Sequence, residues 1–68
     1  MVSKFSIRLK ELREEKELSQ AQLAKKVNIK QANISRWENK IQDPSIDYII
    51  ALAEFFGVTT DYLLGVTD

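Results

Sequence analysis

Residues 20–37 read QAQLAKKVNIKQANISRW, and the predicted architecture is built around this segment. Its apolar side chains recur at helical spacing on both sides of Asn28. They are Leu23, Ala24, Val27, Ile29, Ile34 and Trp37. Asparagine is the commonest residue other than glycine in the left-handed conformation that closes a helix. The pattern therefore predicts two short helices, over 20–27 and 31–38, that are joined by a tight turn at Asn28 and approach closely at the small Ala24.

The sequence on either side of this pair predicts three further helices, over 5–16, 46–56 and 60–64. The first has apolar residues at i, i+4 and i+7, namely Phe5, Leu9 and Leu12. Pro44 and Ser45 predict the start of the second, because proline disfavours a helical residue before it and serine is a favourable N-cap. The predicted buried stripe of this helix is Ile46, Ile49, Ala53 and Phe56. Thr59 can cap the last helix. The expected fold is all-α: a compact five-helix bundle in one domain, 1–68.

The composition bounds what such a domain can do. The 68 residues include no cysteine and no histidine, so disulfides are excluded and a zinc site is not expected. The longest uncharged apolar stretch, Ile49–Ala53, is too short to span a bilayer. No signal peptide is evident, so a soluble cytoplasmic protein is expected. We predict no metal, cofactor, membrane or small-molecule substrate.

Charge is unevenly distributed along a chain whose net charge is zero. Residues 19–40 contain five basic side chains and one acidic side chain, whereas 41–68 contain five acidic side chains and no basic one. A basic middle beside an acidic end favours a polyanion partner on one face. The charge pattern leaves one alternative open, in which these charged side chains are simply exposed to water and bind no partner.

The paired helices also predict an exposed set of polar groups. Two short helices joined by a three- or four-residue turn form a helix-turn-helix, in which the second helix enters the major groove of DNA. At 100° per residue, Ile34 and Trp37 lie about 60° apart and define the buried side of that helix. The residues on the opposite side and its flanks are Gln31, Ala32, Asn33, Ser35 and Arg36. Their amide, methyl, hydroxyl and guanidinium groups can contact base edges. A merely solvated polar surface is the alternative, most of all for Asn33 and Ser35.

Four motifs make the pattern more specific. They are LSQAQLA (18–24), ISRWEN (34–39), DPS (43–45) and GVTTDYLLG (57–65). With them, the chain from about Phe5 to Gly65 resembles the lambda-repressor-like or Cro-type family, also called Xre-like. The resemblance implies sequence-specific binding of double-stranded DNA, usually by a homodimer on a palindromic operator, and a role in transcription regulation, here expected as a repressor. It also implies base contacts by Gln31, Ala32 and Arg36.

Backbone contacts are predicted from the same resemblance and from helix electrostatics. Gln20 begins a helix, where free amides and the helix dipole favour a phosphate, and the resemblance implies that it also touches Gln31. The predicted phosphate-contacting set is Ser19, Gln20, Lys30, Asn39, Lys40 and Gln42. For Lys25 and Lys26, DNA contact and simple solvation both stay open.

Arg13 and Glu38 are predicted to pair. The resemblance places the arginine of the first helix against the glutamate that ends the recognition helix, as a structural clamp. The alternative is that Arg13 reaches a phosphate itself.

Two residues depart from the family pattern. Lys30 stands where relatives usually have Ser or Thr as the N-cap, and losing a cap costs roughly 1 kcal/mol; our hypothesis is that Lys30 contacts DNA instead. Lys40 stands where glycine is usual. Either Lys40 adopts a left-handed backbone or Asn39 takes the turn in its place.

Two other functional classes compete with DNA binding. An enzyme is not expected, because the chain has no histidine, no cysteine and no phosphate-binding glycine loop. A protein-interaction role, as in an antitoxin or adaptor, is the stronger alternative. It would use the surface of the last two helices, where Tyr48, Ile50, Phe55 and Tyr62 are predicted to lie off the buried stripe. The same four residues are the predicted homodimer surface, whereas Trp37 is assigned to the core.

Overall fold

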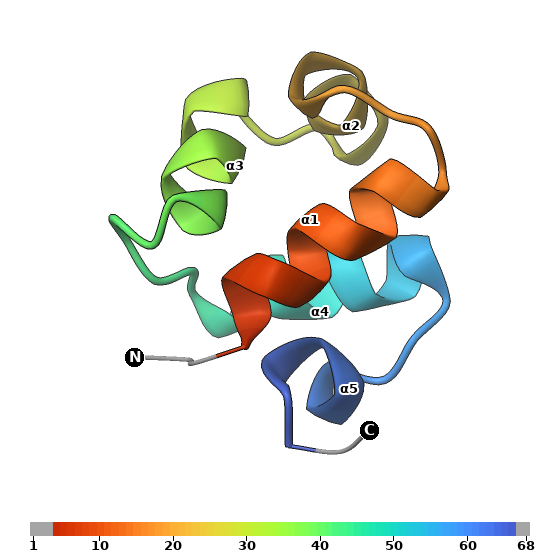
Figure 1. The fold of residues 1–68 in the computed structure, drawn as a ribbon, viewed down its shortest axis with the longest axis vertical. Coiled ribbons are helices and arrows are strands. Elements are labelled where there is room, and N and C mark those ends of the chain that lie inside the picture. Colours follow the sequence, from red (N-terminus) through yellow and green to blue (C-terminus); the bar gives the residue numbers. More distant parts are fainter. Residues whose placement is uncertain (1–3, 67–68) are drawn as a thin grey trace.

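The computed structural model describes residues 4–66, which form five helices (Figure 1). The helices are α1 (Phe5–Glu15), α2 (Gln20–Val27), α3 (Gln31–Glu38), α4 (Ile46–Phe56) and α5 (Thr60–Leu64). Within this part of the chain there is no strand, so the all-α prediction is confirmed. The first helix ends one residue earlier than expected, and the other four ranges agree. None of these helices has the length and apolar character needed to cross a bilayer.

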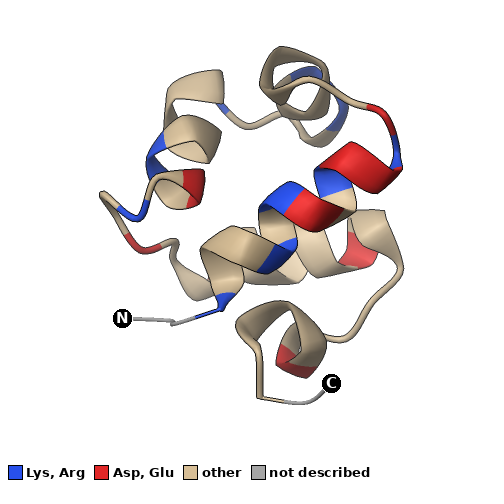
Figure 2. Ribbon diagram, viewed as in Figure 1, with Lys and Arg blue, Asp and Glu red and all other residues tan. Residues whose placement is uncertain are grey.

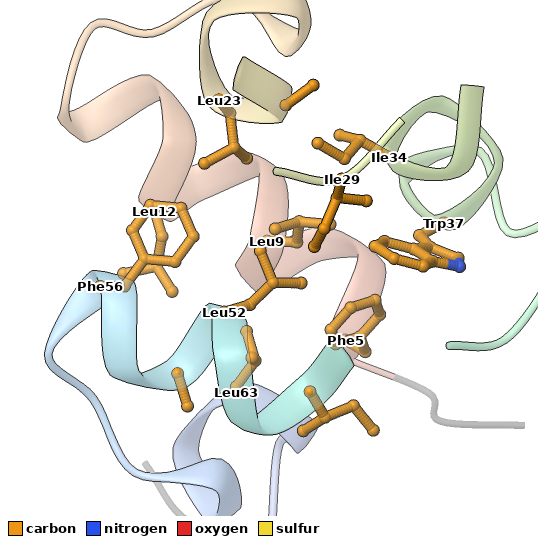
Figure 3. Packing of buried hydrophobic residues seen from close by; sticks show 13 residues of the cluster. Phe5, Leu9, Leu12, Leu23, Ile29, Ile34, Trp37, Leu52, Phe56 and Leu63 are labelled. Atoms are coloured by element: carbon orange, nitrogen blue, oxygen red, sulfur yellow. The ribbon is translucent and has the colours of Figure 1, made fainter. Parts of the chain in front are cut away.

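Each helix contributes one side chain with no exposed surface to a single core (Figure 3). These side chains are Leu9, Leu23, Ile34, Leu52 and Leu63. In Figure 1, α2 and α3 pack together at one end of the molecule and α5 lies at the other. α1 contacts both α3 and α5, and α4 contacts α2 and α5. α3 is therefore held by the same core as the rest of the fold.

The predicted stripe of α4 was wrong at one end. Ile46 is 60% exposed, and Leu52, which the prediction omitted, is fully buried. At 100° per residue, the four buried residues of α4 span about 100°, and Ile46 lies just outside that arc. It also lies in the first turn of α4. Helical spacing alone could not show that the end of the helix is uncovered.

Both ends of α2 follow local rules, and the start of α4 does not. Ser19 and Gln22 form a capping box at the start of α2, with hydrogen bonds of 3.1 and 2.8 Å. Asn28 adopts the expected left-handed conformation (φ 57°), and its amide donates to the carbonyl of Ala24. Ser45 occupies the N-cap position of α4, but its side chain makes no capping hydrogen bond, contrary to the expectation.

The short α5 is attached to the start of α1. Arg8 Nη1 donates to the carbonyl of Tyr62 at 2.6 Å, and the guanidinium carbon lies 4.2 Å from the centre of the Tyr62 ring. Gly65 closes α5 in a left-handed conformation (φ 84°). A Cβ atom at Gly65 would overlap the side chain of Lys4, so this contact requires glycine.

Candidate nucleic-acid interface

α3 presents three polar or small side chains on the side opposite its buried residues. Ile34 and Trp37 are buried, whereas Gln31, Ala32 and Arg36 are exposed. In the described part of the chain, none of these three side chains is buried against another segment. The geometric condition for base contact is therefore met, and the base contacts themselves stay a prediction.

Asn33 and Ser35 are less available than the other three predicted base contacts. Both side chains are half-buried. Ser35 Oγ accepts a hydrogen bond from Asn39 Nδ2 at 3.3 Å, one turn further along α3. Asn33 lies beside a hollow next to the α3–α4 connection. These two residues lie at the edges of the exposed surface, where the solvated alternative was strongest.

The start of α2 leaves backbone donors open. The capping box uses the amides of Ser19 and Gln22, and the amide of Leu23 donates to the Ser19 carbonyl. The amides of Gln20 and Ala21 have no partner within the helix, as is normal for a first turn. An anion is favoured at such a position by these donors and by the helix dipole.

A charged network joins the end of α3 to α1 and to the start of α2. Arg13 Nε and Nη2 donate to the two carboxylate oxygens of Glu38 at 2.7 and 2.9 Å, in a bidentate pair. Arg13 Nη1 donates to the carbonyl of Leu18 at 2.8 Å. Gln20 Nε2 donates to Glu38 Oε1 at 3.1 Å. Glu38 thus accepts bonds from both α1 and α2, and this fixes where α3 ends.

This network gives Gln20 a partner that was not predicted, because its side chain donates a hydrogen bond to Glu38. The contact with Gln31 that the family resemblance implied stays a prediction. Gln20 and Glu38 are 18 positions apart, so no local pattern could indicate the pair. The carbonyl of Leu18 was missed for a similar reason, because any main-chain oxygen can accept from an arginine.

The Arg13–Glu38 pair is screened from water. The side chain of Glu38 is 3% exposed and that of Arg13 is 11% exposed. The hydrogen bond to Glu38 raises the pKa of Arg13 above its ordinary value, although burial acts in the opposite direction. Burying the pair is expensive, and it is tolerated because both carboxylate oxygens have donors. The position of Arg13 does not favour the alternative in which it reaches a phosphate.

The two unusual lysines flank the recognition helix. Lys30 is the N-cap residue of α3 and makes no side-chain capping bond. Lys40 itself adopts the left-handed conformation (φ 61°), while Asn39 does not (φ −92°). This decides between the two alternatives for the turn. Both lysines are exposed at opposite ends of α3.

Figure 2 shows how the charges are arranged in space. α1 carries both basic and acidic residues, α2 and the segments that flank α3 carry lysines, and α3 carries Arg36, whereas the charged residues of α4 and α5 are all acidic (Figure 2). The sequence asymmetry is therefore also a spatial one. The basic part coincides with the helix that exposes Gln31, Ala32 and Arg36.

The predicted dimer surface is divided by the fold. Tyr48 and Ile50 are 38% and 43% exposed, but at 100° per residue they lie about 160° apart around α4. Phe55 lies on the Tyr48 side and is half-buried, with Lys16 Nζ 5.7 Å from its ring centre. Tyr62 is half-buried beneath Arg8. The four residues do not form one continuous patch.

A family model described as helix-turn-helix matches residues 9–63, which include α2, α3 and α4 in full. The chain belongs to the helix-turn-helix family. The resemblance to lambda-repressor-like, or Xre-like, proteins is thereby confirmed. The match also agrees with the prediction that this helix-turn-helix domain is not an enzyme.

Three curated proteins are similar to the helix-turn-helix chain. The HTH-type transcriptional regulator ImmR of Bacillus subtilis (strain 168) is 41% identical over 58 residues, which cover 85% of the chain and 46% of that protein. The uncharacterized HTH-type transcriptional regulator YobD of the same strain is 36% identical over 61 residues, covering 90% of the chain and 54% of that protein. The HTH-type transcriptional activator BcrR of Enterococcus faecalis is 36% identical over 61 residues, covering 90% of the chain and 30% of that protein. The chain spans about half the length of these relatives or less.

Replacing Lys30 with Ser is expected to stabilise the helix-turn-helix domain and weaken its binding to DNA. A serine at the N-cap can accept an amide hydrogen bond of α3, which contributes about 1 kcal/mol to the free energy of unfolding. Loss of the positive charge at the start of α3 is expected to remove one phosphate contact. Urea denaturation and a binding titration measure the two effects. Ser19→Ala, which removes an observed cap, is the matched control and is expected to lower stability by a similar amount. An unchanged DNA affinity for Lys30→Ser would show that Lys30 has no contact with DNA.

Proposed function

We propose that this domain binds double-stranded DNA in a sequence-specific manner, with α3 in the major groove, and that it regulates transcription as a repressor. The observation that carries the proposal is the exposure of Gln31, Ala32 and Arg36 on a helix whose end is fixed by Glu38. A groove-binding helix has to be rigid because base contacts require a set docking angle. The charged network around Glu38 meets that need.

The proposed base contacts follow from donor and acceptor geometry. Arg36 can donate two hydrogen bonds to guanine, Gln31 can pair with adenine through its amide, and the methyl group of Ala32 can contact the methyl group of thymine. Asn33 and Ser35 are secondary members of the set because both are half-buried.

Phosphate contacts are proposed on both sides of this helix. On the α2 side they involve Ser19 and Gln20, where backbone amides are open. On the other side they involve the exposed Asn39, Lys40 and Gln42. Lys30, at the start of α3, completes the set. Such contacts set the register and much of the affinity without distinguishing bases.

A homodimer on a palindromic operator is part of the proposal. α3 has eight residues, so it extends only about 12 Å and can contact a few base pairs. Two copies related by a two-fold axis would place their recognition helices about 34 Å apart, one turn of DNA. The domain measures 27 × 24 × 19 Å, which suits two copies side by side at that spacing. The exposed Tyr48 flank of α4 is the proposed dimer contact.

We also propose repression and a cytoplasmic location. A dimer that covers a turn of duplex can block other proteins from that DNA with no additional surface. One relative is named as an activator, so activation is the competing outcome. A reporter gene placed behind the selected operator distinguishes the two by the direction of the change. Fractionation of cells tests the location.

Selection from a random duplex pool tests the proposed function directly. We expect an enriched sequence with two-fold symmetry and half-sites about one helical turn apart. Affinity is expected to fall steeply with salt, because each neutralised phosphate contributes about 0.9 to the slope of log Kobs against log salt. With Lys30 and Lys40 on each of two subunits, the slope is about −4 or steeper. A shallow slope with no enriched sequence would favour the adaptor or antitoxin alternative instead.

A further inference from the structure

A hollow of about 310 Å³ lies where the ends of α1, α2 and α4 meet. Four residues line it, namely Lys16, Leu18, Lys26 and Phe55. Lys16 directly follows α1, Leu18 lies in the connection to α2, and Lys26 lies in the last turn of α2. Phe55 lies near the end of α4. The hollow is thus built by three helices that are brought together only in the folded chain.

The two apolar lining residues continue the hydrophobic core outward. Leu18 and Phe55 are half-buried and pack against the core. The ring of Phe55 meets the ring of the buried Phe56 edge-on, 5.0 Å away centre to centre. Apolar surface that stays in contact with water favours an apolar group from outside.

Two unpaired lysines border this apolar surface. Lys16 and Lys26 are exposed, and neither forms an ion pair with any described residue. Lys16 Nζ lies 5.7 Å from the centre of the Phe55 ring. The residues that line the hollow include no acidic side chain. The group that complements this surface is therefore an apolar side chain with carboxylates beside it.

The connection that carries Leu18 is held in place by hydrogen bonds. The Leu18 amide donates to the carbonyl of Arg13 at 3.1 Å, and the Leu18 carbonyl accepts from Arg13 Nη1 at 2.8 Å. Between Lys16 and Leu18, Glu17 adopts the left-handed conformation (φ 56°). A lining segment that is already fixed loses little conformational freedom when a partner binds.

The hollow lies away from the proposed DNA surface. None of its lining residues belongs to α3. In Figure 1 the ends of α1 and α4 lie on the opposite side of the molecule from α3. Phe55 lies two turns along α4 from Tyr48, about 10 Å, so a dimer contact at Tyr48 leaves the hollow open. A further partner can therefore reach it while DNA is bound.

We infer that this hollow binds an acidic segment of a partner protein. One bulky apolar side chain of the segment lies between Leu18 and Phe55, and carboxylates on either side of it pair with Lys16 and Lys26. The inference goes beyond the proposed function. It gives Lys26 a role that the sequence left open between DNA contact and solvation.

The shape of the hollow favours a protein segment over a small molecule. The hollow is open to solvent, and its volume is at the lower end of the range for small-molecule sites, about 300–1,000 Å³. Such sites bury most of the surface of their ligand. An open hollow cannot do so, whereas a protein segment also covers the surface around the hollow.

Titration of the full chain with a short acidic peptide tests this surface. The probe is a capped peptide with phenylalanine at its centre and two glutamates on each side. We expect the backbone amide NMR signals of Leu18, Lys26 and Phe55 to shift. Replacing the central phenylalanine with alanine removes the apolar anchor and is expected to weaken binding about tenfold.

Two neighbouring lysines of α2 provide a matched pair of variants. Lys26→Glu turns an attraction into a repulsion and is expected to weaken peptide binding about tenfold. Lys25→Glu makes the same change of charge at a side chain that does not line the hollow. At about 0.15 M salt, where charges more than about 8 Å apart are largely screened, it is expected to weaken binding about twofold or less. Both lysines are exposed, so circular dichroism should show both variants folded.

Each contrary outcome identifies a different occupant or none. Equal binding of the alanine peptide, or equal loss for the two lysine variants, means attraction by charge alone and overturns the inference. Phenylacetate that shifts the same signals as strongly as the peptide assigns a small-molecule site and overturns it. Release of the peptide by the selected operator assigns the hollow to DNA, and signals that shift only with the concentration of the protein assign it to a second copy. Each of these results overturns the inference, as does the absence of any shift with millimolar peptide. The proposed function is measured separately by the operator titration and stands or falls on that result alone.

Discussion

Replacing Arg13 with Met is expected to lower the free energy of unfolding by about 3–5 kcal/mol. The substitution leaves the carboxylate of Glu38, 3% exposed, with one hydrogen bond from Gln20. It also removes the donor to the Leu18 carbonyl. A domain of this size has a total stability of roughly 3–10 kcal/mol, so the substitution is expected to remove a large part of it. Urea denaturation followed by circular dichroism measures the loss.

Two controls separate burial of charge from loss of packing. Glu15→Gln removes an exposed charge from α1 and is expected to change stability by no more than about 0.5 kcal/mol. The double variant Arg13→Met, Glu38→Met removes both charges, and it should regain much of what the single variant loses, because no buried charge is left unpaired. A loss below about 1 kcal/mol for Arg13→Met would mean that the pair behaves as an ordinary surface ion pair. The clamp role would then be wrong.

Arg36→Ala has the largest expected effect on DNA binding. A bidentate contact with a base contributes about 1–3 kcal/mol of discrimination, and a dimer loses two of them. Affinity for the selected operator is therefore expected to fall by roughly 30-fold or more, with a smaller loss on unrelated DNA. Because Arg36 is exposed, stability should change by no more than about 0.5 kcal/mol. Titrations of operator and unrelated duplex at fixed salt measure both losses.

Arg36→Lys distinguishes base contact from charge. Lysine keeps the positive charge but lacks the planar fork that pairs with guanine. We expect the salt slope to be retained and the preference at one base pair of each half-site to relax. An equal loss of affinity on operator and unrelated duplex for Arg36→Ala would assign Arg36 to the phosphates instead.

The positions of the helix ends were predictable because their causes are local. Asn28 and Gly57 close helices in the left-handed conformation, and Ser19 starts one, as their side-chain chemistry indicates. The exposed side of α3 was predictable because 100° per residue and two bulky apolar anchors determine it. The burial of Leu52 and the exposure of Ile46 were not, because they depend on what covers α4.

Local sequence is enough to predict the helices, the turn between α2 and α3, and the side of α3 that faces outward. Each depends on residues within one or two turns of one another, where backbone geometry leaves few choices. The bonds from Arg13 and Gln20 to Glu38, and the left-handed turn at Lys40, could be seen only in the folded chain. These depend on which helices meet and at what angle, and that is settled by packing of the whole core.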